Sequence, residues 1–239
     1  MQTQYASTYS AGLPLTRDAK PGKGLRALTL LTVAGLSLVT VRGLLTGNWW
    51  FFEMLAWNLF LAWFPLGVVL VLRDLRASQF RSSWLLIGGL LTWLVFFPNA
   101  PYIITDLSHI KHIDMPLIWF DTMTLFMFAL TGLLVGLYSI LIVHRMLKPV
   151  LGKWQLWGLL VVSQFLSGFG IYLGRIGRWN SWDILTNPSS LMVAIAHTYH
   201  DHLSIKLTLA YGFVLIVLYV AFYWYAEHED DPTSKVRLF

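Results

Sequence analysis

Three ionisable side chains follow one another at intervals of three residues in the middle of the chain: Asp106, His109 and His112. On a helix, residues three apart lie on one face. One carboxylate and two imidazoles in this pattern suit a divalent metal such as zinc, manganese or iron. Without a metal, Asp106 beside His109 is the arrangement of a general acid–base pair. A structural interpretation stays open too, in which Asp106 caps a short helix and the histidines lie among lipid headgroups.

A second polar cluster, Gly-Arg-Ile-Gly-Arg-Trp-Asn-Ser-Trp-Asp, covers residues 174–183. Two arginines three apart at a helix end can hold a phosphate or a carboxylate with paired hydrogen bonds. In the alternative, they pair with Asp106, Asp121 or Asp183 and only lock helix ends together. The candidate ligand-binding residues are therefore Asn99, Asp121, Arg175, Arg178, Asn180 and Asp183.

Pro98 and Pro101 interrupt the apolar run that leads to Asp106. A proline has no N–H and its ring displaces the carbonyl four residues back, so the carbonyls of Leu94 and Phe97 lose their helical partners. Irregular backbone at membrane depth survives only where protein buries it or where it lines a wet cavity. We predict an unwound segment at Phe97–Tyr102 that forms a cavity wall, with Asn99 side-chain atoms satisfying the freed backbone groups.

The composition indicates an integral membrane protein whose main partner is the lipid bilayer. The chain is 56% hydrophobic and only 12% charged, whereas soluble domains carry about 25% charged residues. The absence of cysteine excludes disulfides and thiolate nucleophiles. The net charge of +5 does not indicate nucleic-acid binding, because the basic residues lie in loops where membrane topology explains them.

Six apolar runs are long enough to cross a bilayer, which needs roughly 20 residues. Their predicted limits are 25–45, 49–72, 84–105, 117–143, 154–175 and 204–226. The predicted fold is all-α: a polytopic bundle of about six spans, formed by residues 25–226 as a single domain. Residues 1–24 are expected to be a flexible cytoplasmic arm and residues 227–239 a cytoplasmic tail.

The apolar run Ser189–His200 is too short to span. We expect it to form a short helix that lies in or dips into the outer interface, with a seventh crossing as the alternative.

Two GxxxG patterns and two polar residues predict contacts between helices. Gly132 with Gly136, and Gly170 with Gly174, have the spacing that lets helix backbones approach closely in lipid, although glycine is common in membrane helices. Asn58 and Gln164 lie near the middle of their spans, where interhelical hydrogen bonds are expected.

The strings FFPNAPYIITDLSH, WFD and GRIGRWNSWDILTNP resemble the bacterial multi-spanning proteins grouped as domain of unknown function 1361. The resemblance covers roughly residues 50–225. It implies a bacterial inner-membrane protein of six or so helices whose distinguishing residues lie in these blocks, and it brings no biochemical activity with it.

Two functions fit these features, and the sequence does not decide whether the protein is an enzyme. In the first, an outward-facing polar pocket binds or processes an anionic or lipid-linked small molecule, with Asp106 and His109 as the candidate catalytic pair. In the second, the protein is a non-catalytic scaffold or accessory subunit whose outer loops dock a partner. No comparable set of ionisable residues is expected at the inner end.

The distribution of basic residues predicts the orientation. With the N-terminus inside, inner segments hold twelve of the 17 lysines and arginines, and the outer side holds only Arg42, Lys111, Arg175, Arg178 and Lys206. The positive-inside rule then places both termini in the cytoplasm.

We expect reporter fusions after residue 239 and within 105–116 to give opposite compartments. Enzymatic reporters active on only one side of the membrane measure this directly. The same compartment for both fusions would overturn the predicted topology.

Overall fold

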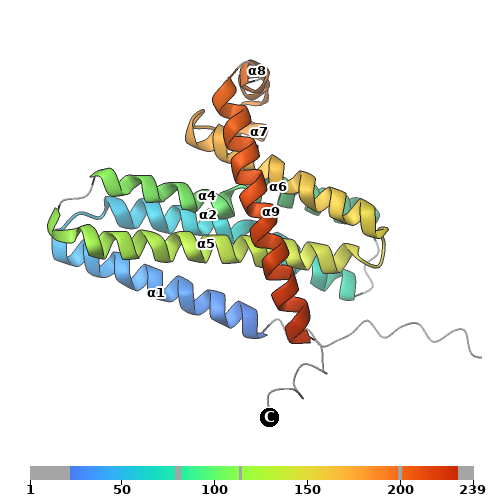
Figure 1. Cartoon of the computed structure of the whole chain (residues 1–239), viewed down its shortest axis with the longest axis horizontal. Coiled ribbons are helices and arrows are strands. Elements are labelled where there is room, and N and C mark those ends of the chain that lie inside the picture. Colours follow the sequence, from blue (N-terminus) through green and yellow to red (C-terminus); the bar gives the residue numbers. More distant parts are fainter. Residues whose placement is uncertain (1–21, 79–81, 113–114, 199–200, 231–239) are drawn as a thin grey trace, which may run out of the picture.

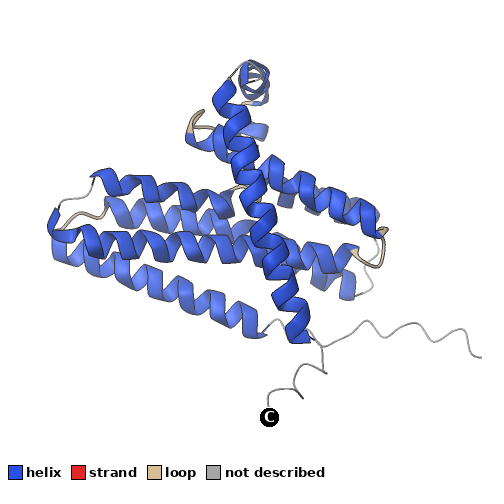
Figure 2. Cartoon of the chain, in the orientation of Figure 1, coloured by secondary structure: helices blue, strands red, loops and turns tan. Residues whose placement is uncertain are grey.

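The computed structural model describes residues 22–78, 82–112, 115–198 and 201–230, with the side chains of 111, 112, 115 and 228–230 left out. All regular structure in these residues is helical (Figures 1 and 2). Its elements are α1 (Gly22–Thr46), α2 (Trp50–Ala77), α3 (Ser83–Phe96), α4 (Asn99–Tyr102), η1 (Ile103–His112), η2 (Met115–Leu117), α5 (Ile118–Leu147), α6 (Lys153–Arg175), α7 (Asp183–Thr186), α8 (Pro188–Thr198) and α9 (His202–Asp230).

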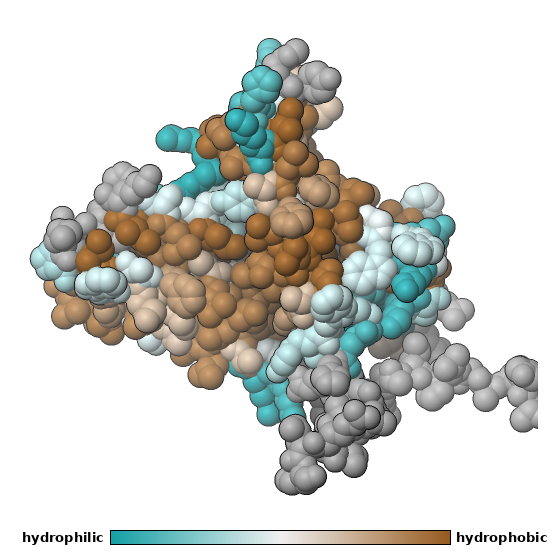
Figure 3. Space-filling view, viewed as in Figure 1, coloured by the Kyte–Doolittle hydropathy of each residue, from teal (hydrophilic) through white to brown (hydrophobic). Residues whose placement is uncertain are grey.

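Six helices in the described part of the chain are long and apolar enough to cross a membrane: 22–46, 50–77, 83–110, 118–147, 153–175 and 202–227. Every predicted span lies within five residues of one of them at both ends. The surface over these helices is predominantly hydrophobic (Figure 3). The protein is therefore a multi-pass integral membrane protein with an all-α fold.

Helix α5 is the centre of the bundle. Two thirds of its most apolar window (67%) is buried inside the protein, against 17% for α9. Helices α1 and α2 pack along α5 and against each other, whereas α9 packs mainly on α6 and crosses it in Figure 1. The short helices α7 and α8 follow α6 and lie beyond its end (Figure 1).

The interruption predicted at the prolines is confirmed, because α3 ends at Phe96 and a turn precedes α4, but the prediction that Phe97–Tyr102 is unwound is wrong. The backbone stays in the right-handed helical region at Phe97, Pro98 and Ile103, and the chain passes from α3 through α4 into the 3₁₀ helix η1. Pro98 is the N-cap of α4, and Pro101 falls in its first turn. N–H groups in a first helical turn have no intrahelical partner, so the missing N–H of each proline costs little there.

The prediction that Asn99 satisfies freed backbone groups is corrected in the same way. The Ser181 hydroxyl donates to the Val95 carbonyl at 3.1 Å, and Asn99 Nδ2 donates to that hydroxyl at 3.1 Å. A residue from the segment after α6 therefore covers the open backbone, and Asn99 orients it.

Both GxxxG patterns pack against α4, on different sides of it. A Cβ on Gly132 would lie 2.7 Å from the Ala100 carbonyl oxygen, and one on Gly136 would lie 3.1 Å from the Ala100 Cβ. On α6, a Cβ on Gly170 would lie 2.6 Å from the Pro98 ring. A Cβ on Gly174 would lie 3.0 Å from the ring of Tyr102. We call Gly132, Gly136, Gly170 and Gly174 the glycine clamp.

Substitution within the clamp should destabilise the protein. In Gly132→Ala the new methyl group meets backbone that cannot rotate away, so we expect a loss of about 1–3 kcal/mol in the free energy of unfolding. Gly158→Ala is the matched control, since nothing lies within 4 Å of its Cβ position; the higher helix propensity of alanine should leave it neutral or slightly stabilised. Thermal unfolding in detergent measures both, and equal midpoints would contradict the close contact.

Candidate functional site

Asp106 is buried at a junction where η1, α2 and α6 meet. Its side chain is almost fully buried on η1. One carboxylate oxygen accepts a hydrogen bond from Asn58 Nδ2 of α2 at 2.8 Å, and the other lies 3.4 Å from Arg175 Nη1 at the end of α6. This confirms the predicted contact between an arginine of the second cluster and an acidic residue of another element. It also confirms the interhelical hydrogen bond expected of Asn58.

His109 belongs to the same junction. The Arg175 guanidinium donates to the Ser108 hydroxyl and lies 3.4 Å from His109 Nε2. The His109 ring meets Trp50 edge-on at 5.7 Å between centroids. Asp106 and His109 thus lie close together, but both are held by Arg175.

The predicted metal site extends beyond the described side chains, because His112 is among those left out. Among the side chains that the structure does describe, no group of three histidine, aspartate or glutamate residues is placed to hold a metal ion. The proposed set of Asp106, His109 and His112 therefore stays a prediction.

Asp121 pairs with a residue that the sequence did not indicate as its partner. Arg42 Nε of α1 lies 2.8 Å from Asp121 Oδ1 in the first turn of α5, with both side chains buried. The Arg42 guanidinium also lies 4.0 Å from the centre of the Phe51 ring. The sequence could have indicated that Arg42 is paired, because an arginine at the end of a membrane helix needs a counter-charge, although it could not have indicated which acidic residue is the partner.

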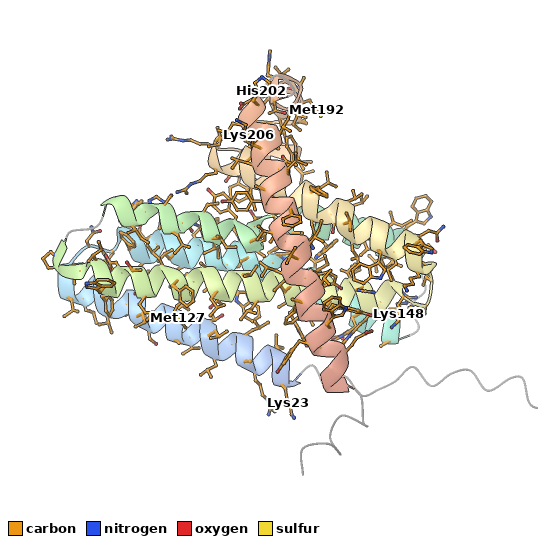
Figure 4. The ribbon with its side chains drawn as sticks, in the orientation of Figure 1. Lys23, Met127, Lys148, Met192, His202 and Lys206 are labelled. Atoms are coloured by element: carbon orange, nitrogen blue, oxygen red, sulfur yellow. The ribbon has the colours of Figure 1, made fainter. Side chains whose placement is uncertain are left out.

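A cavity of about 670 Å³ opens beside this junction. Its walls come from α2, the α3–α4 turn, α6 and the segment 178–195. The lining is mostly apolar, as at Leu166 and Met192, and Figure 4 labels Met192 on α8. Polar lining is supplied by Asn58, Asn99, Arg178, Asn180 and Ser181.

The cavity gathers only part of the predicted ligand-binding set. Asn99, Arg178 and Asn180 line it, whereas Asp121 and Arg175 are used in the buried ion pairs. The remaining residue, Asp183, accepts the backbone N–H of Asn180 at 2.7 Å and so shapes the turn that carries the lining residues.

Arg178 has an unusual backbone conformation. Its φ of 56° lies in the left-handed region, the only such value among the described residues other than glycine. The next N–H, of Trp179, closes the end of α6 by donating to the Leu173 carbonyl at 3.1 Å. Glycine is the usual residue in this conformation at a helix end. The Arg178 side chain is exposed and makes no ion pair with a described residue.

Tyr172 of α6 fixes the start of α9 near this end. Its hydroxyl donates to Asp201 Oδ2 at 2.5 Å. This hydrogen bond, together with the N–H of Leu203, holds the pKa of Asp201 below its usual range. Asp201, the residue directly before α9, is therefore tied back to α6.

A polar cluster that the sequence did not indicate gathers at the opposite end of α5. His144 is buried, with its Nδ1 2.5 Å from the Tyr219 hydroxyl of α9. Its ring stacks on Tyr223 at 4.6 Å and meets Trp157 of α6 edge-on at 5.2 Å. Glu227 accepts from Tyr223 and pairs with Lys148 at 3.3 Å. Sequence reasoning missed this cluster because its members are single residues on three separate helices.

The family comparison matches the part of the chain that contains both polar clusters described in the sequence analysis. The profile described as "Protein of unknown function (DUF1361)" matches residues 57–218, which is well over half of the chain. The chain belongs to this family. The matched region includes α4, η1, α6 and the segment that lines the cavity. No curated protein and no solved structure matches the chain.

Loss of one partner from the buried Arg42–Asp121 pair should be strongly destabilising. Arg42→Leu leaves a buried carboxylate without its cation, and we expect it to cost about 3–5 kcal/mol in the free energy of unfolding. The double variant Arg42→Leu/Asp121→Leu should regain much of this loss. Arg73→Leu is the control: its partner Asp74 is 69% exposed, and an exposed pair contributes about 0–1 kcal/mol. Equal losses for Arg42→Leu and Arg73→Leu would contradict the importance of the buried pair.

Proposed function

We propose that this family member binds an anionic amphiphile, a molecule with a phosphate or carboxylate group and an apolar tail, in the cavity beside α4. The observation that carries the proposal is Arg178. A non-glycine residue in the left-handed region costs about 1–2 kcal/mol, and such strain gathers at functional sites. Here the strained residue is a cation that lines a largely apolar cavity and has no acidic partner among the described residues.

The surrounding polar groups suit an anion better than a catalytic centre. Asn180 lines the cavity two residues after Arg178, and its amide group, which donates one hydrogen bond to Asp183 at 3.5 Å, has a second N–H to donate. The other arginine of the cluster, Arg175, forms an ion pair with Asp106. It therefore holds the cavity wall in position and is not available to bind the ligand. Asp106 and His109 do not line the cavity, and the proposal is therefore one of binding, without an assigned reaction.

The apolar lining indicates why the ligand has a tail. The lining includes Leu166, Phe169 and Leu173 of α6 and Leu191, Met192 and Ile195 of α8. A small inorganic anion leaves these side chains uncovered, whereas an acyl or isoprenoid chain covers them and gains about 25 cal/mol for each Å² removed from water. Ligand pockets of this size and polarity are typical sites for small molecules.

The orientation belongs to the same proposal. We infer that the protein lies in a bacterial cytoplasmic membrane with both termini in the cytoplasm, so that the cavity opens towards the outer side. The excess of lysine and arginine in the segments assigned to the inside supports this. A ligand with its headgroup at the outer surface and its tail in the bilayer reaches the cavity from the membrane.

Arg178→Gly should separate stability from binding. Glycine relieves the backbone strain, so we expect the free energy of unfolding to rise by about 1 kcal/mol while binding of the anion is lost. Short-chain phosphatidylglycerol titrated into the detergent-solubilised protein is the probe, followed by tryptophan fluorescence, because Trp57 and Trp179 line the cavity. Arg178→Lys should retain measurable binding, since it keeps the charge.

The matched control is Lys206→Ala, which removes an exposed cation from α9 (labelled in Figure 4). It should bind phosphatidylglycerol as the unmodified protein does. If Arg178→Gly binds as tightly as Lys206→Ala, the proposed function is wrong. If Arg178→Gly loses both stability and binding, Arg178 has a structural role and the argument from strain fails.

A further inference from the structure

A second hollow lies on the outer surface of α2, next to the cavity. It is lined by Trp50, Glu53, Met54, Ala56, Trp57 and Phe60, and we call it the glutamate groove. Glu53 is exposed within it and has no ion-pair partner among the described residues. An acidic residue in a first helical turn matches the helix dipole, but the dipole does not account for the aromatic side chains on both sides of it.

The aromatic rings beside Glu53 stay open. Trp50 is 51% exposed and Trp57 is 54% exposed. They lie three residues before and four residues after Glu53, so all three side chains share one face of α2. A carboxylate with indole rings on either side is suited to an ammonium group, which gains both an ion pair and cation–π attraction.

Trp57 belongs to both hollows. It lines the glutamate groove and it also lines the cavity that contains Arg178. Its ring lies 6.3 Å from that of Trp182, in the segment that carries the cavity wall. Glu53 is one helical turn from Trp57, a rise of about 6 Å. Within the described part of the chain, an anion and a cation without ion-pair partners therefore line two hollows that share Trp57.

We infer that the ligand's headgroup is zwitterionic: a lipid that carries a phosphate, bound at Arg178, and an amine, bound at Glu53 between Trp50 and Trp57. This inference rests on the proposed function, because the phosphate occupies the same cavity. It narrows the ligand from any anionic amphiphile to an aminophospholipid. Glu53 then selects for the amine, and Arg178 provides the anchor that any phosphate can use.

Competition between two lipids tests the inference. The purified protein is equilibrated with equal amounts of phosphatidylethanolamine and phosphatidylglycerol, and the retained lipids are counted by native mass spectrometry. The unmodified protein should retain more phosphatidylethanolamine. Glu53→Gln removes the ion pair and keeps both indole rings, so it should lower the ratio of phosphatidylethanolamine to phosphatidylglycerol about two- to fivefold, with the total retained unchanged. Asp74→Asn is the control, since it removes an exposed carboxylate from the opposite end of the same helix and should leave the ratio unchanged.

The outcomes for the two sites are distinguishable. A ratio that is the same in the unmodified protein, Glu53→Gln and Asp74→Asn overturns the zwitterion inference and leaves the proposed function intact. Retention of both lipids that is unaffected by Arg178→Asn overturns the proposed function as well. Soluble phosphoethanolamine added as a competitor identifies the source of the ligand: displacement shows that the headgroup suffices, and no displacement shows that the tail is needed for binding.

Discussion

Two prolines in the third membrane helix set the constraint on which the rest of the structure depends. They end α3 and begin α4, and a backbone break at membrane depth has to be covered by protein. The glycine clamp brings α5 and α6 directly onto Pro98, Ala100 and Tyr102. The Ser181 hydroxyl donates a hydrogen bond to the carbonyl of Val95. The same contacts place the segment after α6 against α4, and this juxtaposition forms the cavity.

Ion pairs then make that end of the bundle rigid. Arg42 with Asp121 joins α1 to α5, and Asp106 joins η1 to α2 and α6 through Asn58 and Arg175. Arg42, Asp121, Asp106 and Arg175 are all paired in this way. They therefore hold the helices around the cavity in position and are not available to bind a ligand. Arg178 and Glu53 are different, because each is exposed, lines a hollow and has no ion-pair partner among the described residues. A rigid frame with two uncommitted charges is suited to recognition of a headgroup.

The opposite end of α5 is held by a different kind of contact, a cluster of stacked aromatic side chains. His144, Tyr219, Tyr223 and Trp157 form an aromatic cluster that joins α5, α6 and α9. Helix α9 is otherwise the most lipid-exposed of the six spans, so this cluster and its packing on α6 fix its position. The protein is thus closed at one end by stacked rings and at the other by ion pairs, with the cavity beside the ion pairs.

The sequence by itself determined the membrane class, the six spans to within five residues at each end and the positions of the close-packing glycines. Those features depend on local composition and on helical spacing. It also indicated the two blocks that carry the candidate site, including Asn99, Arg178 and Asn180. Tertiary structure decided which charges neutralise one another, because Arg42 and Asp121 are far apart along the chain and either could have met another partner. It likewise decided that the prolines start a new helix instead of unwinding the old one, since Ser181 and the clamp stabilise that turn from outside it.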